Sequence, residues 1–277
     1  MSRPADDGTL TQAQVTAYLH RLGASAPTSA SVEALAALHR AHLFTVPFEN
    51  LDIHLGRPMP LDPDSLFRKV VGERRGGYCY ELNGLFAALL RSLGYAVTLV
   101  SARVATAEGG LTPEFDHLAL VVDSPEMAQA HLADVGFGEA FLDPLPLRDG
   151  FERREGLKRV GLAEALGVWT YREDRGEGWR RQYVFSIQPR SRAEFEPRHA
   201  WQQTSPESHF RQSTVVSLAT PSGRVTVSEN RLIVTESGHR EECELADGEV
   251  PNVLRERFGI VLLRQAARHT VVRRRSV

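Results

Sequence analysis

One segment, residues 80–93, constrains the fold of this chain more than any other. Its large apolar side chains recur with the spacing of one face of a helix, and they are Leu82, Leu85, Phe86, Leu89, Leu90 and Leu93. A stripe this wide is typical of an amphipathic helix that is buried over most of its surface. Gly94 follows, where a left-handed cap ends many helices. We therefore predict a buried helix over residues 80–93.

The overall composition excludes several classes of protein. The chain has 277 residues, of which 42% are apolar and 25% charged, so disorder, collagen and coiled coil do not describe it. Its formal net charge of −2 gives no general attraction to nucleic acid or membranes. The N-terminus has no apolar signal core, and the apolar run near residues 85–90 is too short to cross a bilayer. We expect no nucleic-acid partner and no membrane partner, while the oligomeric state stays open.

The two cysteines, Cys79 and Cys243, lie far apart in the sequence. This number is too small for a disulfide scaffold and fits a reducing compartment, so we expect a cytoplasmic protein. Neither cysteine has the spacing of zinc ligands, so we expect no metal site. Cys243 lies in the polar stretch 240–247 and is interpreted as a bystander thiol.

The order of elements predicts an α+β fold. Thr11 and Gln14 form a possible capping box before a helix that ends at Gly23. Further helices are expected over 31–42, 65–71 and 250–257, with a turning or extended segment at 46–51. Residues rich in Val, Leu and aromatics predict strands at 95–105, 115–122, 131–137, 181–188, 213–220, 224–228, 231–235 and 260–263. The charged stretches 148–159 and 172–181 are interpreted as solvated loops.

Cys79 lies at the start of the predicted helix. The free N–H groups and the dipole of a helix N-terminus stabilise an anion, so a thiolate is favoured there. Gly76 and Gly77, in a predicted tight turn, leave the sulfur approachable. An ordinary buried cysteine is the alternative interpretation, and position alone does not decide between the two.

His117 begins an otherwise apolar strand, and Asp134 lies in the next one. In a hairpin whose paired residue numbers sum to 251, these two residues face each other, and the carboxylate can fix the imidazole tautomer. A buried pair without chemistry remains the alternative. His20, His39 and His269 are interpreted as residues of helix surfaces or the tail.

Five short motifs are similar to those of the arylamine N-acetyltransferases and occur in the family's order. The first is RRGGYCYELN at residues 74–83, which resembles the active-site motif RGG(Y/F)C-x-E-x-N. The others are PFENL at 47–51, DHL at 116–118, DVGFG at 134–138 and SHF at 208–210. Several motifs in the correct order are far more specific than a lone cysteine and histidine.

The resemblance implies a papain-like cysteine transferase fold. It implies a helical domain at 1–94 that carries the cysteine, a β-barrel at 95–205 that carries the histidine and aspartate, and an α/β lid at 206–277. It implies a triad of Cys79, His117 and Asp134, with no permanently bound cofactor. Acetyl-CoA is then the co-substrate, and an arylamine, arylhydrazine or N-hydroxyarylamine accepts the acetyl group from the Cys79 thioester.

The resemblance also implies which residues meet the two substrates. Phe48, Phe137 and Phe210 match positions of the aromatic acceptor pocket, although each is also compatible with a plain core position. Gly136 and Gly138 match positions where CoA approaches the backbone, and both also suit a bulge or turn. The Cys79 N–H is expected to hold the oxyanion, with a second donor near Val104, which we place among the CoA-binding residues. Arg75 and Glu81 are expected to be structural partners of nearby backbone or of each other.

Other functions use the same three residues. A cysteine peptidase or amidase has the same triad, and an amide synthase that closes a macrolactam is a variant within the family. A transferase must exclude water from its thioester, and the DVGFG segment and the expected lid favour transfer. A non-enzymatic binding protein would not need the intact triad. The 17-residue spacing from His117 to Asp134 is longer than in many bacterial relatives, which places the additional length in the loop 123–130.

Overall fold

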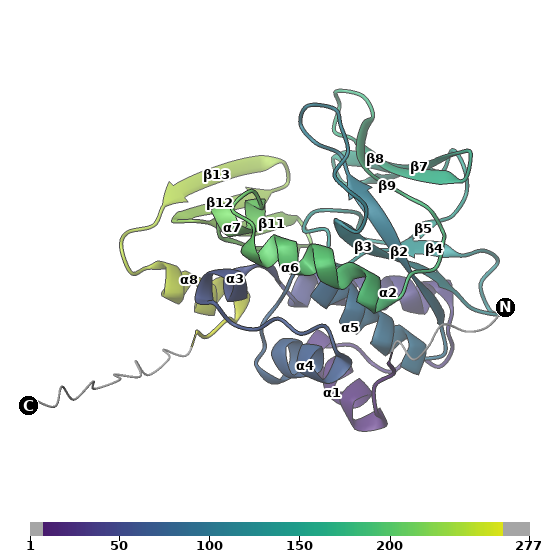
Figure 1. Ribbon diagram of the computed structural model, residues 1–277, viewed down its shortest axis with the longest axis horizontal. Coiled ribbons are helices and arrows are strands. Elements are labelled where there is room, and N and C mark those ends of the chain that lie inside the picture. The colour runs from purple at the N-terminus through teal and green to yellow at the C-terminus, as the bar shows by residue number, and fades with distance from the viewer. Residues whose placement is uncertain (1–7, 263–277) are drawn as a thin grey trace, which may run out of the picture.

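The computed structural model describes residues 8–262 as a mixed helix and sheet protein. Figure 1 shows α1, α4 and α5 gathered together, with an eight-stranded sheet on one side and a five-stranded sheet on the other. The α+β class predicted from the sequence is confirmed. No helix among the described residues 8–262 is long and apolar enough to cross a membrane.

The N-terminal part is helical, as predicted. Helix α1 (Gln12–Leu22) begins with the Thr11–Gln14 capping box and ends at Gly23 in the left-handed conformation. The other helices of this part are α2 (Val32–Thr45), α3 (Leu51–Leu55), α4 (Pro63–Phe67), the π-helix η1 (Arg68–Gly72) and α5 (Cys79–Ser92). Helix α3 is the one of these that the sequence did not predict, and the turning or extended segment expected over 46–51 overlaps only its first residue.

Helix α5 is the buried helix predicted over residues 80–93. Its first twelve residues, from Cys79 to Leu90, are all buried. It packs on strand β3 and on helices α1 and α4. Because burial of so much apolar surface dominates the folding free energy, α5 fixes the position of its own first turn within the molecule.

The middle of the chain forms one curled sheet with the strand order β5-β4-β3-β2-β9-β8-β7-β6. Strands β5 and β6 are its two edges, so the expected barrel is an open sheet rather than a closed ring. The strands are β2 (Ala96–Val104), β3 (His117–Asp123), β4 (His131–Ala133), β5 (Leu145–Pro146), β6 (Glu152–Glu155), β7 (Lys158–Ala165), β8 (Val168–Asp174) and β9 (Arg180–Phe185).

The charged stretches 148–159 and 172–181 are only partly the loops that the sequence predicted. Residues 148–151, 156–157 and 175–179 are turns or loops, but the rest contributes to β6, β7, β8 and β9. Arg159 contacts Asp174 at 2.5 Å across the β7–β8 pair, and Arg172 on β8 reaches Glu152 on β6 at 3.1 Å across Gly161 of β7. Opposite charges on one face of a sheet stabilise it, so high charge density did not exclude strands here.

The C-terminal part forms the second sheet, in the order β1-β10-β11-β12-β13. Its strands are β1 (Phe48–Glu49), β10 (Val215–Thr220), β11 (Gly223–Ser228), β12 (Arg231–Glu236) and β13 (His239–Glu244). The helices η2 (Arg192–Phe195), α6 (Glu196–Thr204) and α7 (His209–Gln212) precede it, and α8 (Val250–Phe258) follows it. Strand β1 comes from the helical part, so the C-terminal sheet is completed by a distant segment. The division at residues 94 and 205 stays a prediction.

Near the C-terminus, the strand predicted over 260–263 does not form in residues 260–262, and residue 263 lies outside the described residues. Gly259 adopts φ +68°, and the Ile260 N–H donates to the Leu254 carbonyl, which caps α8. Ile260 is buried as an apolar anchor of that cap. Cys243 is a free, exposed thiol on β13, as expected of a bystander.

Candidate active site

Cys79 is the first residue of α5 and is 4% exposed. At this position its N–H has no helical carbonyl to bind, and the helix dipole favours negative charge. Glu81 accepts a hydrogen bond from the Tyr78 N–H at 3.2 Å and so holds the first turn. The sequence therefore folds the thiol into the place predicted for it.

Gly76 and Gly77 serve packing rather than access to the sulfur. The chain runs extended there instead of in the predicted tight turn, and Gly77 forms a parallel bridge with Phe48. A Cβ at Gly76 would lie 1.8 Å from the Pro47 carbonyl oxygen, and one at Gly77 would lie 2.7 Å from the Glu81 carboxylate. The two glycines let the 47–49 segment lie directly against the approach to Cys79.

His117 and Asp134 meet as the sequence predicted, although by a different register. His117 begins β3, and its Nε2 lies 2.7 Å from Asp134 Oδ2. In the β3–β4 pair Leu120 faces Ala133, so paired residue numbers sum to 253 rather than 251. A shift of two residues keeps each side chain on the same face of the sheet, so the pair survives the error.

Four donors surround the Asp134 carboxylate, which is fully buried. His117 and the Tyr183 hydroxyl donate to Oδ2 at 2.7 and 3.0 Å. Asn83 Nδ2 and the Gly136 N–H donate to Oδ1 at 2.8 and 3.0 Å. A buried carboxylate that accepts this many hydrogen bonds stays ionised and keeps one orientation.

Burial and charge act against each other on both partners. Burial lowers the pKa of His117, but the Asp134 carboxylate and the hydrogen bonds to Asp134 and Cys79 outweigh it and raise this pKa to about 10. Burial raises the pKa of Asp134, but His117, Asn83 and Gly136 bring it below its ordinary value. The imidazole is therefore cationic at neutral pH, and its Nδ1 is left for the Cys79 sulfur.

The three expected acceptor residues are half-buried and lie around this centre. The Phe137 ring contacts His117 edge-on at 5.1 Å between centroids. The rings of Phe48 and Phe210 lie 6.1 Å apart, and Phe210 also packs on Tyr78, next to the cysteine. These rings come from three distant segments and give the site an aromatic border.

The residues expected to meet CoA have partners within the protein. A Cβ at Gly136 would lie 2.7 Å from Cys79 Cα, so this glycine lets the 134–138 segment close on α5. Gly138 has φ +88° and lies beside the Phe48 ring. The Val104 N–H donates to Thr112 Oγ1 at 2.8 Å, so the structure does not support Val104 as the second oxyanion donor. Contact of CoA with these three residues stays a prediction.

Sequence analysis gave no role to Asn83 or Tyr183. Asn83 lies one helical turn after Cys79, and that spacing is a signal that could have identified it. Tyr183 has no such signal, because only the β2–β9 pairing brings this strand beside Asp134. Of the histidines read as surface or tail residues, His20 is exposed, His269 lies outside the described residues, and His39 is wholly buried, which corrects its interpretation.

A second group of buried charges lies behind the approach to α5. Arg75 pairs with Glu49 at 2.8 Å and with Asp52 at 3.0 Å. Lys69 pairs with Asp52 at 2.8 Å and with Glu81 at 2.7 Å. Arg75 and Glu81 are thus structural residues, as expected, but they pair through these partners and not with each other. Within residues 8–262 no three His, Cys, Asp or Glu residues are grouped so that they could hold a metal ion.

Comparison with known proteins gives consistent relatives. A family model described as N-acetyltransferase matches residues 31–267. The curated arylamine N-acetyltransferase / N-hydroxyarylamine O-acetyltransferase of Salmonella typhimurium is 32% identical over 250 residues, which cover 88% of each chain.

Solved structures agree with this result. The arylamine N-acetyltransferase from Salmonella typhimurium superposes with a TM-score of 0.86 at 30% identity, over 94% of this chain and 95% of the other. The Mycobacterium marinum arylamine N-acetyltransferase in complex with CoA gives a TM-score of 0.83 at 30% identity, over 89% and 92% of the two chains. The similarity therefore covers nearly the whole of both molecules.

Proposed function

Since this chain belongs to the arylamine N-acetyltransferase family, we propose that its acetyl transfer is carried out by Cys79, His117 and Asp134. The enzyme is an acyltransferase that uses acetyl-CoA as co-substrate and needs no permanently bound cofactor. The comparisons give no support to a hydrolase or an amide synthase. The residue assignment rests on one observation. The imidazole of His117 lies between the Asp134 carboxylate and the Cys79 thiol.

The first half-reaction charges the enzyme. The Cys79 thiolate attacks the thioester carbonyl of acetyl-CoA and forms a tetrahedral intermediate, whose oxyanion the Cys79 N–H stabilises. The bond between the acetyl carbon and the CoA sulfur then breaks. The departing thiolate takes the proton from the His117 imidazolium, which leaves acetyl-Cys79, free CoA and a neutral imidazole.

The second half-reaction transfers the acetyl group. The nitrogen of an aromatic amine attacks the carbonyl of acetyl-Cys79, and His117 accepts the proton that this nitrogen loses. The bond between carbon and the Cys79 sulfur breaks, and the thiolate and imidazolium pair is restored. Asp134 stays ionised throughout and keeps the imidazole in the required tautomer.

The aromatic border supports an aromatic acceptor. Phe48, Phe137 and Phe210 offer flat apolar faces close to His117 and Tyr78, and such faces stack on an aniline ring. We extend the acceptor class to arylhydrazines and N-hydroxyarylamines, which have the same flat ring. CoA approaches from the side of Gly138 in this proposal.

The wider arrangement of the site supports two finer parts of the proposal. A thiol at a helix N-terminus, with a histidine on the adjacent sheet and an aspartate just after the next strand, is what a papain-like arrangement requires. Both cysteines are free thiols, which supports a reducing, cytoplasmic location.

The decisive experiment is the intact mass of the protein after incubation with acetyl-CoA and no acceptor. We expect a gain of one acetyl group on the wild type, its discharge by an added arylamine, and no gain on Cys79→Ala. An unchanged wild-type mass would refute acetyl-CoA as the donor. A gain that persists in Cys79→Ala would refute Cys79 as the nucleophile.

A further inference from the structure

His39 is a wholly buried histidine that the mechanism above does not use. It lies on α2, while the nucleophile is on α5. Its ring stacks on Phe141 at 5.5 Å, nearly parallel, and meets the edge of Phe86 at 6.1 Å. These contacts leave the imidazole one orientation, so its two nitrogens point to fixed partners.

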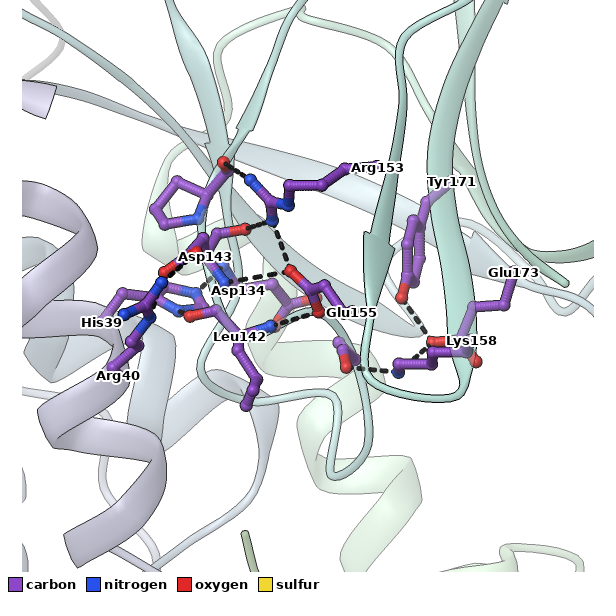
Figure 2. Close-up of polar contacts among 12 residues, drawn as sticks. His39, Arg40, Asp134, Leu142, Asp143, Arg153, Glu155, Lys158, Tyr171 and Glu173 are labelled. Atoms are coloured by element: carbon purple, nitrogen blue, oxygen red, sulfur yellow. Dashed lines mark hydrogen bonds and ion pairs between the residues drawn. The ribbon is translucent and has the colours of Figure 1, made fainter. Parts of the chain in front are cut away.

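Both partners of the His39 ring are backbone groups, which decides its tautomer. Nε2 lies 3.0 Å from the backbone nitrogen of Asp134, and Nδ1 lies 2.8 Å from the Leu142 carbonyl oxygen. Figure 2 shows His39 beside Leu142 and Asp134. A peptide N–H can only donate and a carbonyl can only accept. The ring is therefore neutral, with its hydrogen on Nδ1 and a lone pair on Nε2.

The Leu142 end of this connection is itself held in place. The N–H groups of Leu142 and Asp143 donate to the Glu155 carboxylate at 2.9 and 3.4 Å. Arg40, the next residue on α2, pairs with Asp143, and Arg153 pairs with Glu155 (Figure 2). Two consecutive residues of α2, His39 and Arg40, therefore bind the segment that follows Asp134.

Asp134 needs such a contact because of where its strand ends. Strand β4 stops at Ala133, and the pair of Leu120 with Ala133 ends the β3–β4 ladder. The N–H of Asp134 is buried, and a buried peptide N–H without an acceptor is costly. His39 supplies that acceptor from another element of the fold.

We propose that His39 is a positioning residue for acetyl transfer, which sets the backbone of Asp134 and through it the carboxylate that orients His117. This inference rests on the proposed role of Asp134. The connection runs from Glu155 through Leu142, His39 and Asp134 to His117, and each contact in it is a hydrogen bond.

The charges around His39 agree with a neutral ring. Burial lowers the pKa of His39, and the nearby carboxylates and the Leu142 carbonyl offset this only in part. The titratable groups that face it are Asp134, Asp143, Glu155 and, on its own helix, His42. A second proton on Nε2 would point at the Asp134 N–H and break the contact.

Two substitutions test the contacts of the two ring nitrogens of His39 separately. His39→Gln keeps an acceptor near the Nε2 position for the Asp134 N–H, whereas His39→Asn keeps only the polar group near Nδ1. We expect the single-turnover rate of Cys79 acetylation to fall about tenfold to a hundredfold in His39→Asn. In His39→Gln it should stay within about threefold of wild type. His42→Asn is the control, because His42 is a wholly buried histidine of the same helix whose ring nitrogens bind no partner among the described residues.

The pH profile distinguishes positioning from mere stability. A displaced Asp134 supports the His117 imidazolium less, so the alkaline limb of the acetylation rate should move to lower pH in His39→Asn and not in His42→Asn. Equal rates and equal limbs in the Asn and Gln variants would overturn the inference. The same loss in a His42→Asn protein of matched stability would also overturn it.

Nitrogen NMR of the wild-type protein gives a test that needs no variant to fold. We expect His39 to show a protonated Nδ1 and an unprotonated Nε2, unchanged from about pH 6 to about pH 9. An Nε2–H tautomer or a titration in this range would overturn the inference. Failure of wild-type acetylation refutes the proposed function, whereas normal acetylation with indifferent His39 variants refutes the positioning role alone.

Discussion

Two groups of buried polar side chains flank the first turn of α5, and they differ in what they leave open. In the ionic network, Arg75, Glu49, Asp52, Lys69 and Glu81 bind one another. In the proposed triad, the Asp134 carboxylate has four hydrogen-bond donors, but His117 keeps one ring nitrogen for the Cys79 thiol. Polar groups that all bind one another hold the chain in place, whereas catalysis needs one group, here a ring nitrogen of His117, that stays available for the reacting atom.

Loss of the Asp134 charge should give the largest change in activity. In Asp134→Asn the fold is kept, but His117 loses its anion, so the acetylation rate should fall about 10³- to 10⁴-fold. Rapid-quench mass spectrometry measures this rate. Asp123→Asn, at the other end of strand β3, is the control and should retain wild-type activity. A fall of less than about tenfold in Asp134→Asn would contradict the difference between the two groups, because His117 and Asp134 would then behave like a structural pair.

Removing Arg75 should chiefly change stability. Arg75→Met leaves Glu49 and Asp52 buried without their main partner, which should cost about 3–5 kcal/mol in the free energy of unfolding. Urea unfolding measures this cost, with Arg180→Met at the exposed Arg180–Glu177 pair as the control, expected to lose less than about 1 kcal/mol. Wild-type stability of Arg75→Met with an activity as low as that of Asp134→Asn would reverse the two roles.

Tyr183→Phe tests how many hydrogen-bond donors the Asp134 carboxylate needs. The variant loses one of four donors to the carboxylate, the hydroxyl at 3.0 Å, and we expect acetylation to slow about tenfold. Tyr171→Phe is a matched control, because Tyr171 pairs with Tyr183 in the sheet but its hydroxyl binds Glu173. Equal rates in the two variants would show that the carboxylate does not depend on this donor.

The pH profile of the wild type should be flat where an ordinary histidine would titrate. The pKa of His117 is raised to about 10, above its value of about 6.5 in the unfolded chain. The stabilisation from its protonated form is therefore complete below about pH 6.5 and is lost as the pH rises through about 10. We expect the alkaline limb of acetylation near pH 10 in stopped-flow measurements. A limb near pH 6.5 would show that Asp134 does not hold the imidazolium.

Cys243→Ser should give the smallest effect. This thiol is exposed on β13, so the unfolding free energy should change by less than about 0.5 kcal/mol. Acetylation should be unchanged, as judged by intact mass. A lower acetyl gain in this variant would show that the second thiol takes part.

Some of the site was predictable because it depends on local patterns. The helical period of residues 80–93 predicted α5, and the cysteine before it defined the N-terminus. His39 was misread, although Leu35, Leu38, His39 and His42 follow one another at the spacing of a single helix face. That pattern places both histidines on the buried side of α2, where the structure has them. Because histidine is a polar residue, its place on the buried face of this helix was overlooked.

Other features depend on contacts that no local pattern records. The strands β6 to β8 could not be recognised from their own sequences, because their charged side chains pair with residues on other strands. Tyr183 reaches Asp134 only through the pairing of β9 with β2. The hairpin register was predicted with an error of two residues, and the contact survived because side chains alternate with a period of two.

The short strand β1 ties the acceptor side of the site to the end of the chain. Asn50, which follows β1, binds the Val215 N–H, 165 positions later. Closing so long a loop is slow, and the contact order of this pairing is among the highest that the chain offers. A ribosome-bound chain that has not yet reached β10 can already contain Cys79, His117 and Asp134, but the aromatic border formed by Phe48 and Phe210 still lacks this support. Synthesis must therefore pass Val215 before the proposed acceptor side of the site is complete.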